Sequence, residues 1–122
     1  MATNAINWFE IPVSNLERAT KFYGNILGAK FEPMEAMGLR MAFFPMENGG
    51  VGGGLVQGDG YEPTTQGIHV YLNGGDDLNG VLGKVEAAGG KVVLPKTSIG
   101  QDGFMAFFLD TEGNKVGLHS KH

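Results

Sequence analysis

Two stretches of the chain alternate apolar and polar side chains with the two-residue period of a β-strand. They are INWFEIPV at Ile6–Val13 and GIHVYLN at Gly67–Asn73. The first strand would place Trp8, Glu10 and Pro12 on one face. The second strand would place His69, Tyr71 and Asn73 on one face. We therefore expect a strand over each stretch, with Trp8 and His69 at equivalent places.

A helical pattern follows each strand, with apolar residues spaced three and four apart. The first, LERATKFYGNIL, begins at Leu16 and should end at Gly28, and the second, LNGVLGKVEAA, begins at Leu78 and should end at Gly89. Ser14 with Glu17 three residues later predicts a capping box for the first helix. Asp76 or Asp77 would cap the second helix, in which Gly80 and Gly83 each cost about 1 kcal/mol relative to alanine.

The order of elements is the same in both halves of the chain. Trp8 and His69 are 61 residues apart, Gly28 and Gly89 are also 61 apart, and the string MAFF occurs at 41–44 and again at 105–108. Each half therefore reads as strand, helix, strand, strand, strand. The prediction is one α+β domain of two tandem βαβββ modules, residues 1–60 and 61–122. Paired edge to edge, they would form a curved eight-stranded mixed sheet, with the helices outside and an open concave side that suits a small molecule.

Composition narrows the classes of function. The 122 residues are enough for one packed domain, 42 % of them are hydrophobic, and there is no cysteine, which favours a cytoplasmic protein. The net charge of −4 without a basic cluster argues against a nucleic-acid partner. No leader pattern and no membrane-spanning run stands out, so we expect no membrane association.

Three segments together resemble the vicinal oxygen chelate superfamily, which includes glyoxalase I, extradiol dioxygenases, and fosfomycin- and bleomycin-resistance proteins. They are VSNLERATKFYGNILGAKF, then HVYLN with VEAAGGKVV, then FFLDTEGNKVGLHS, and they cover nearly the whole chain in order. The resemblance implies the glyoxalase/bleomycin-resistance fold, and fold alone does not fix activity.

The resemblance also implies where a divalent metal would bind in the family's enzymes. Those positions fall on Trp8, at or near Gly54, on His69 and on Gly117. Only His69 is a usual ligand, since an indole nitrogen is a donor and glycine has no side chain. About three protein ligands are needed for such a metal, so we expect no cofactor in the family's site. The alternative is a displaced metal site built from Glu10, His69 and His119.

Three functions therefore stay open at the level of sequence. The function that we favour is binding or sequestration of a small organic molecule in the cavity between the two modules, without metal, as the resemblance to bleomycin-resistance proteins implies. The chain could also be a metal-dependent lyase, isomerase or dioxygenase of the glyoxalase type, or it could carry out metal-free acid–base catalysis with Glu10 and His69. The expected ligand-binding residues are Trp8, Glu10, His69, Tyr71, Asn73, Gly117 and His119. Unpaired sheet edges and the resemblance together predict a homodimer.

Overall fold

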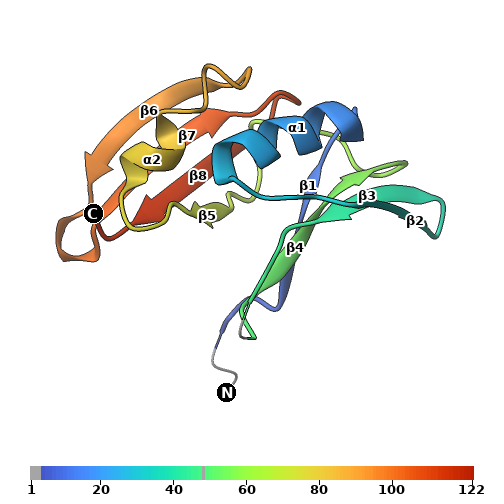
Figure 1. Ribbon diagram of the computed structural model, residues 1–122, viewed down its shortest axis with the longest axis horizontal. Helices are drawn as coiled ribbons and strands as arrows, with labels where there is room; N and C mark the ends of the chain where they lie inside the picture. The colour runs from blue at the N-terminus through green and yellow to red at the C-terminus, as the bar shows by residue number, and fades with distance from the viewer. Residues whose placement is uncertain (1–3, 48) are drawn as a thin grey trace.

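A computed structural model describes residues 4–47 and 49–122, and its first half is a four-stranded sheet covered by one long helix (Figure 1). The strands run in the spatial order β1-β4-β3-β2, with β1 parallel to β4 and the other neighbours antiparallel. The elements of this first module are β1 (Trp8–Pro12), α1 (Leu16–Leu27), β2 (Pro33–Ala36), β3 (Leu39–Phe43) and β4 (Gly52–Gln57).

The second half repeats this arrangement, with the strand order β5-β8-β7-β6 and β5 parallel to β8. Its elements are β5 (Tyr71–Asn73), α2 (Leu78–Leu82), β6 (Lys91–Ser98), the short 3-10 helix η1 (Gly100–Asp102), β7 (Phe104–Leu109) and β8 (Lys115–Ser120). The predicted α+β fold with two βαβββ modules is confirmed. The eight strands form two four-stranded sheets, and within the described ranges no ladder joins β1 to β5.

The strand registers confirm that the modules are copies of one plan. Phe43 lies opposite Gly54 in the first sheet, and Phe107 lies opposite Gly117 in the second. On the other side of each glycine, Glu10 lies opposite Gly54 and Tyr71 lies opposite Gly117. The repeated MAFF string therefore occupies the same position in both sheets.

The sequence predicted the end of α1 correctly, but not the residue that caps its beginning. Gly28 ends α1 in the left-handed conformation, with φ of 63°, as predicted. The predicted capping box at Ser14 is wrong, because Asn15 is the N-cap and its side chain accepts from the Arg18 N–H. Glu17 instead forms an ion pair with Arg40 of β3, which is a contact between elements that local sequence does not reveal.

The second helix is shorter than the pattern predicted. Asp77 caps it as expected, but regular α-helix ends at Leu82, and residues 83–89 form turns. Gly80 and Gly83 weaken the helix, and its apolar residues still pack, since Val85 is fully buried. The strand expected over Gly67–Asn73 is also shorter, because β5 begins only at Tyr71.

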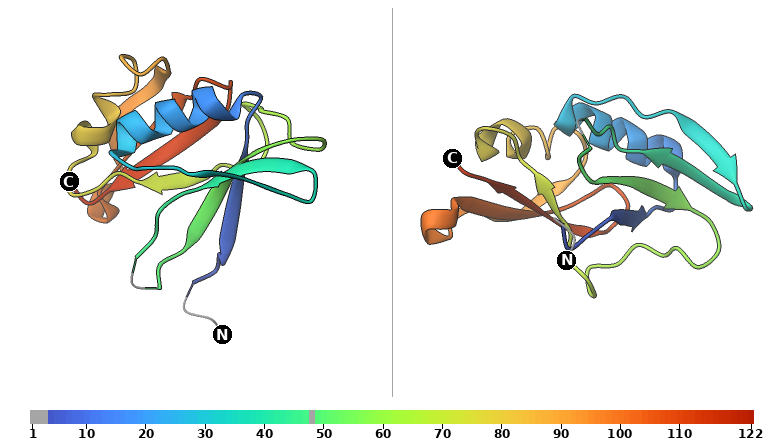
Figure 2. Two further views of the ribbon diagram at one scale, coloured as in Figure 1. Left: turned by 45° about the vertical axis from the view of Figure 1, so that its right-hand side comes forward. Right: turned by 90° about the horizontal axis from the view of Figure 1, so that it is seen from below.

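Both helices lie on one side of the sheets and share a single core with them (Figure 2). Phe22 and Tyr23 of α1 reach the second module, with their ring centroids 5.8 Å and 6.4 Å from that of Phe108 in β7. Within the described residues, this burial leaves the opposite side of each sheet without an α-helix. We call it the helix-free face, and the site lies there.

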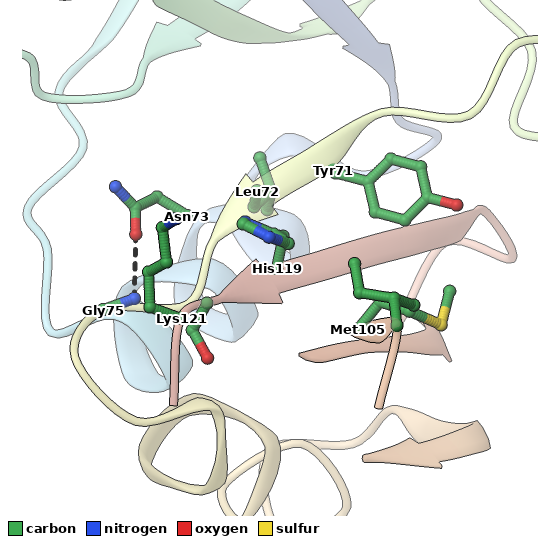
Figure 3. Close-up of a pocket in the computed structure, with 9 residues that line it drawn as sticks. Tyr71, Leu72, Asn73, Gly75, Met105, His119 and Lys121 are labelled. Carbon is green, nitrogen blue, oxygen red and sulfur yellow. Dashed lines mark hydrogen bonds between the residues drawn. The ribbon is translucent and has the colours of Figure 1, made fainter. Parts of the chain in front are cut away.

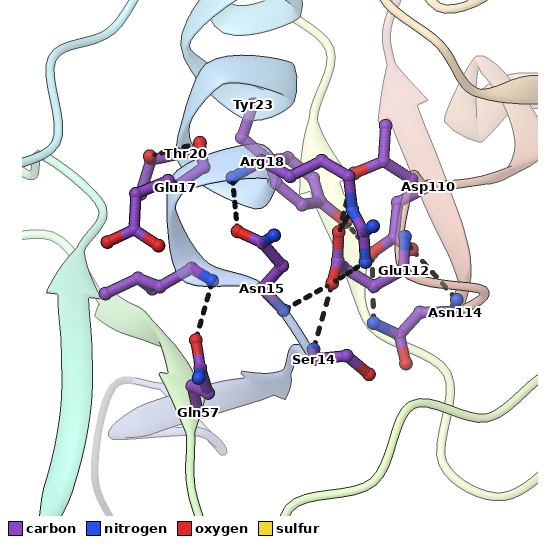
Figure 4. A network of polar contacts seen from close by, with 12 residues as sticks. Ser14, Asn15, Glu17, Arg18, Thr20, Tyr23, Gln57, Asp110, Glu112 and Asn114 are labelled. Carbon is purple, nitrogen blue, oxygen red and sulfur yellow. Dashed lines mark hydrogen bonds and ion pairs between the residues drawn. The ribbon is translucent and has the colours of Figure 1, made fainter.

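A polar network ties the two modules together below α1 (Figure 4). Glu112, in the turn between β7 and β8, accepts hydrogen bonds from Arg18 and from the backbone N–H groups of Ser14 and Asn15. Asn114 donates to the Pro12 carbonyl oxygen at 2.7 Å. The DTEGN turn of the second module therefore holds the segment that leads into α1 of the first.

Candidate functional site

A pocket of about 740 Å³ opens on the helix-free face of the second module (Figure 3). Alternation along the strands explains part of its wall, because Tyr71 and Asn73 of β5, Met105 of β7 and His119 of β8 point away from the core. The pocket is lined by Tyr71, Leu72, Asn73, Gly75, Ile99, Met105, His119, Ser120 and Lys121. Its volume lies within the range of small-molecule sites.

An aromatic group extends this pocket along the same face. The Tyr71 side chain is 50 % exposed, and its ring centroid lies 5.5 Å from that of Phe107. His69 packs against the other side of this group, with its centroid 5.3 Å from Phe107. Gly117 makes room for Tyr71, because a Cβ atom there would lie 2.5 Å from Tyr71 Cδ2.

Hydrogen bonds fix two of the polar groups in the pocket. Asn73 Oδ1 accepts from the Gly75 N–H at 2.9 Å, which leaves the amide NH₂ of Asn73 available as a donor. His119 Nε2 lies 2.8 Å from the carbonyl oxygen of Asp102. Because a carbonyl oxygen only accepts, this ring nitrogen carries the hydrogen.

A second pocket of about 750 Å³ lies where the two modules meet. It combines Phe9, Leu27 and Phe44 of the first module with His69, Tyr71 and Asn73 of the second. Tyr71, Leu72 and Asn73 line both pockets, so β5 separates one from the other.

Trp8 and Glu10 lie on the helix-free face of the first module and line neither of these two pockets. The Trp8 side chain is 44 % exposed and meets Phe43 edge to face at 5.5 Å. The hydroxyl of Tyr61 donates to Glu10 Oε1 at 2.7 Å, and Trp8 Nε1 donates to Glu10 Oε2 at 3.4 Å. The hydrogen bond to the Glu10 carboxylate raises the pKa of Tyr61.

The expected ligand-binding residues therefore fall into two groups. Tyr71, Asn73 and His119 line the pocket of the second module, next to Gly117 on β8, and His69 lines the pocket between the modules. Trp8 and Glu10 belong to the first module. Trp8 is the first residue of β1, whereas His69 precedes β5. Their positions are still equivalent, because Trp8 lies two residues before Glu10, which is opposite Gly54, and His69 lies two residues before Tyr71, which is opposite Gly117.

The residues present do not fit the family's divalent metal. Trp8, Gly54 and Gly117 offer no ligand atom, which leaves His69 alone. Within residues 4–47 and 49–122, no group of three or more His, Cys, Asp or Glu side chains is placed to hold a metal ion. Glu10, His69 and His119 thus do not form a three-ligand set in this structure.

Sequence reasoning missed six residues that line the pocket of the second module: Leu72, Gly75, Ile99, Met105, Ser120 and Lys121. Met105 belongs to the repeated MAFF string, and the alternation of β7 places it on the same face as Phe107. Ile99 lies in the segment between β6 and β7, and its position depends on where β6 ends. Lys121 follows β8, and only the fold brings it beside β5.

A model of one protein family matches most of the chain. The family is described as "Glyoxalase/Bleomycin resistance protein/Dioxygenase superfamily", and the match covers residues 5–118. Two curated relatives, from Mycobacterium bovis and Mycobacterium tuberculosis, are both named "Putative glyoxylase CFP32". Each is 27 % identical over 114 residues, which is 92 % of this chain. The chain spans 44 % of the length of these relatives, less than half.

Solved structures of the same fold cover nearly the whole chain. A glyoxylase/bleomycin resistance protein/dioxygenase domain from Frankia sp. EAN1pec is 16 % identical, with a TM-score of 0.73 over 99 % of this chain and 94 % of that one. TnmS3, an antibiotic binding protein from Streptomyces sp. CB03234, is 24 % identical, with a TM-score of 0.66 over 98 % of both chains. No helix in the part of the chain that the structure describes is long and apolar enough to cross a membrane.

Proposed function

Because the chain belongs to the glyoxalase/bleomycin resistance protein/dioxygenase superfamily, we propose that it binds a small organic molecule on the helix-free face of its second module, without the family's metal. One observation carries the proposal: the pocket of about 740 Å³ has an apolar and aromatic wall with a few polar groups at defined places. This combination is typical of small-molecule sites. The antibiotic-binding relative from Streptomyces supports the same type of activity on this fold.

Binding is favoured over turnover for two reasons. Three of the four family ligand positions are Trp8, Gly54 and Gly117, so the Lewis acid that the family's enzymes use has too few ligands. The alternative acid–base pair of Glu10 and His69 is divided between two modules, and both carboxylate oxygens of Glu10 accept hydrogen bonds from Trp8 and Tyr61.

Titration calorimetry with a set of small aromatic and carbonyl compounds tests the binding proposal. We expect some of them to bind, and a Tyr71→Leu variant to bind them at least about fivefold more weakly, since one wall of the pocket is lost. Phe43→Leu is the matched control, because Phe43 is a half-exposed aromatic on the same face of the other module. Equal losses in both variants, or no binding by the parent protein, would refute the assignment.

Elemental analysis of protein purified without chelator tests the metal-free part of the proposal. We expect well under one equivalent of zinc, nickel, manganese or iron. Close to one equivalent that disappears in His69→Ala would show that the site holds a metal after all. Gain of a glyoxalase-type activity with added metal would favour the enzymatic alternative in the same way.

We further propose that the protein is a homodimer. In the described part of the chain, the edge strands β1 and β2 of one sheet and β5 and β6 of the other have one ladder partner each, and an edge can accept another chain. Apolar side chains on the helix-free face, such as Trp8 and Phe43, remain partly exposed. Sedimentation should give the mass of two chains at tens of micromolar, and the mass of one chain at that concentration would contradict the proposal.

A further inference from the structure

We propose that the ligand of the second-module pocket is an organic anion, namely a carboxylate on an apolar or aromatic body. This inference rests on the proposed function and adds the ligand's chemical class. It comes from the hydrogen-bonding and charge character of the groups that line the pocket. Neither character can be read from the family to which the chain belongs.

Two polar side chains of the pocket, Asn73 and Lys121, offer donors to a ligand. The Asn73 carbonyl is taken by the Gly75 N–H, which leaves its NH₂ group as a donor. Lys121 has three donors and no acceptor. Ser120 is buried, and its hydroxyl donates to the carbonyl oxygen of His122. A ligand rich in acceptors satisfies the donors of Asn73 and Lys121, whereas a donor-rich ligand leaves both unpaired.

The charges point in the same direction. The chain carries 13 Asp and Glu residues against 9 Lys and Arg, yet no carboxylate side chain is among the residues that line either pocket. Lys121 lines the pocket directly, and Lys115 lies on the same face with its Nζ 4.4 Å from the Phe107 ring centroid. Asp102 meets His119 through its backbone carbonyl oxygen and not through its carboxylate.

The rest of the wall fits an apolar body and not an inorganic anion. In Figure 3, Asn73 and Lys121 are drawn on one side of the pocket, and Tyr71 and Met105 on the other. Ile99 adds a further apolar side chain. A single ammonium and one amide match the two oxygens of a carboxylate, while an aromatic ring can lie against Tyr71.

Three planar compounds of nearly the same shape separate charge from shape: 2-naphthoate, 2-naphthamide and 2-naphthamidine. They place an anion, a neutral amide and a cation on one aromatic body. In titration calorimetry at pH 7 and low salt, we expect 2-naphthoate to bind at least about fivefold more tightly than the amide, because a charge-assisted hydrogen bond is stronger than a neutral one. The amidine should bind most weakly.

A lysine substitution then tests which group recognises the anion. Lys121→Met should weaken 2-naphthoate about three- to tenfold and leave 2-naphthamide unchanged, while Lys121→Arg should retain the preference. Lys21→Met is the matched control, because Lys21 is an exposed lysine of α1 on the helix side of the sheets. It should change neither affinity.

Methyl NMR of methionine places the ligand independently of the variants. The Met105 methyl signal should shift on titration with 2-naphthoate, while that of Met34, on β2 of the other module, should not. The inference is overturned, and the proposed function retained, if the amide or amidine binds at this site as tightly as the acid, or if Lys121→Met binds the acid normally. If none of the three compounds binds at about 5 mM, both fail together, because even a weak small-molecule site would be half filled at that concentration.

Discussion

Replacing Glu112 by alanine should show how much the contacts between the two modules contribute to the stability of the domain. The Glu112 side chain is fully buried, and it is the common acceptor for Arg18 and for the backbone N–H groups of Ser14 and Asn15. Its distances to these donors lie between 2.6 and 2.9 Å. The substitution removes all of these bonds at once, at the point where the chain enters α1.

The expected loss in the free energy of unfolding depends on how well water can take the place of the Glu112 carboxylate as a hydrogen-bond partner. Hydrogen bonds to a charged group contribute about 1.5–3 kcal/mol each. The Arg18 side chain is 50 % exposed, so water can replace most of its interaction with Glu112, and its ion pair adds little to the loss. We therefore expect a loss of about 2–3 kcal/mol in the free energy of unfolding, or roughly 8–12 °C in Tm for a domain of this size. Glu112→Gln keeps the acceptor oxygen and should lose about 1 kcal/mol.

Because Glu112 is ionisable, we also expect its contribution to the free energy of unfolding to depend on pH. Burial raises the pKa of Glu112, but the hydrogen bonds from Arg18, Asn15, Thr111 and Ser14 outweigh it, and the net pKa lies below its ordinary value. A lowered pKa means that this stabilisation is present above the unfolded pKa of about 4.3 and is lost as pH falls through the folded pKa. Stability curves of the parent and Glu112→Gln should therefore converge below about pH 4.

Chemical denaturation and thermal scans, with Glu32→Ala as the control, measure these effects. Glu32 is an exposed glutamate in the segment between α1 and β2, so its removal should be nearly neutral. If Glu112→Ala unfolds at the same denaturant concentration as Glu32→Ala, the turn between β7 and β8 does not hold the modules together. If the pH dependence persists unchanged in Glu112→Gln, another carboxylate is its source.

Three further substitutions have expected outcomes that follow from single contacts. Tyr23→Phe removes a buried hydroxyl that donates to Asp110 at 2.7 Å, so it should destabilise by about 1–2 kcal/mol in denaturant unfolding. Gly80→Ala adds a methyl group where no atom lies within 4 Å, in a helix, so it should raise stability by about 0.5–1 kcal/mol, and a lower Tm would contradict this. Gly117→Ala should displace the Tyr71 ring and weaken ligand binding severalfold with little change in the far-ultraviolet circular dichroism spectrum.

The duplicated plan could be predicted from the order of side chains along the chain. Strand and helix periodicity, the 61-residue spacing and the two MAFF strings were enough to predict two βαβββ modules, because these signals depend on local side-chain order. Gly28 also predicted the end of α1 correctly, because the left-handed backbone conformation that ends a helix favours glycine. The absence of metal-ligand side chains at Trp8, Gly54 and Gly117 was likewise a property of the sequence alone.

Contacts between residues far apart in the chain depend on packing, and local sequence does not reveal them. Packing against α1 places Phe108 in the core and Phe44 against it, with their rings next to Phe22 and Tyr23. Asn15, and not Ser14, caps α1. The backbone N–H groups of both residues donate to Glu112, which lies nearly 100 positions further along the chain.

The pocket is the clearest case of this division. Sequence placed Tyr71, Asn73 and His119 on one face, and it also placed Trp8 and Glu10 with them, because pattern gives the face of a strand but not the distance between two sheets. In the folded chain Trp8 and Glu10 line neither of the two pockets, whereas Met105 and Lys121 line the pocket of the second module. Local periodicity determines which way a side chain points, and the packing of modules determines what it faces.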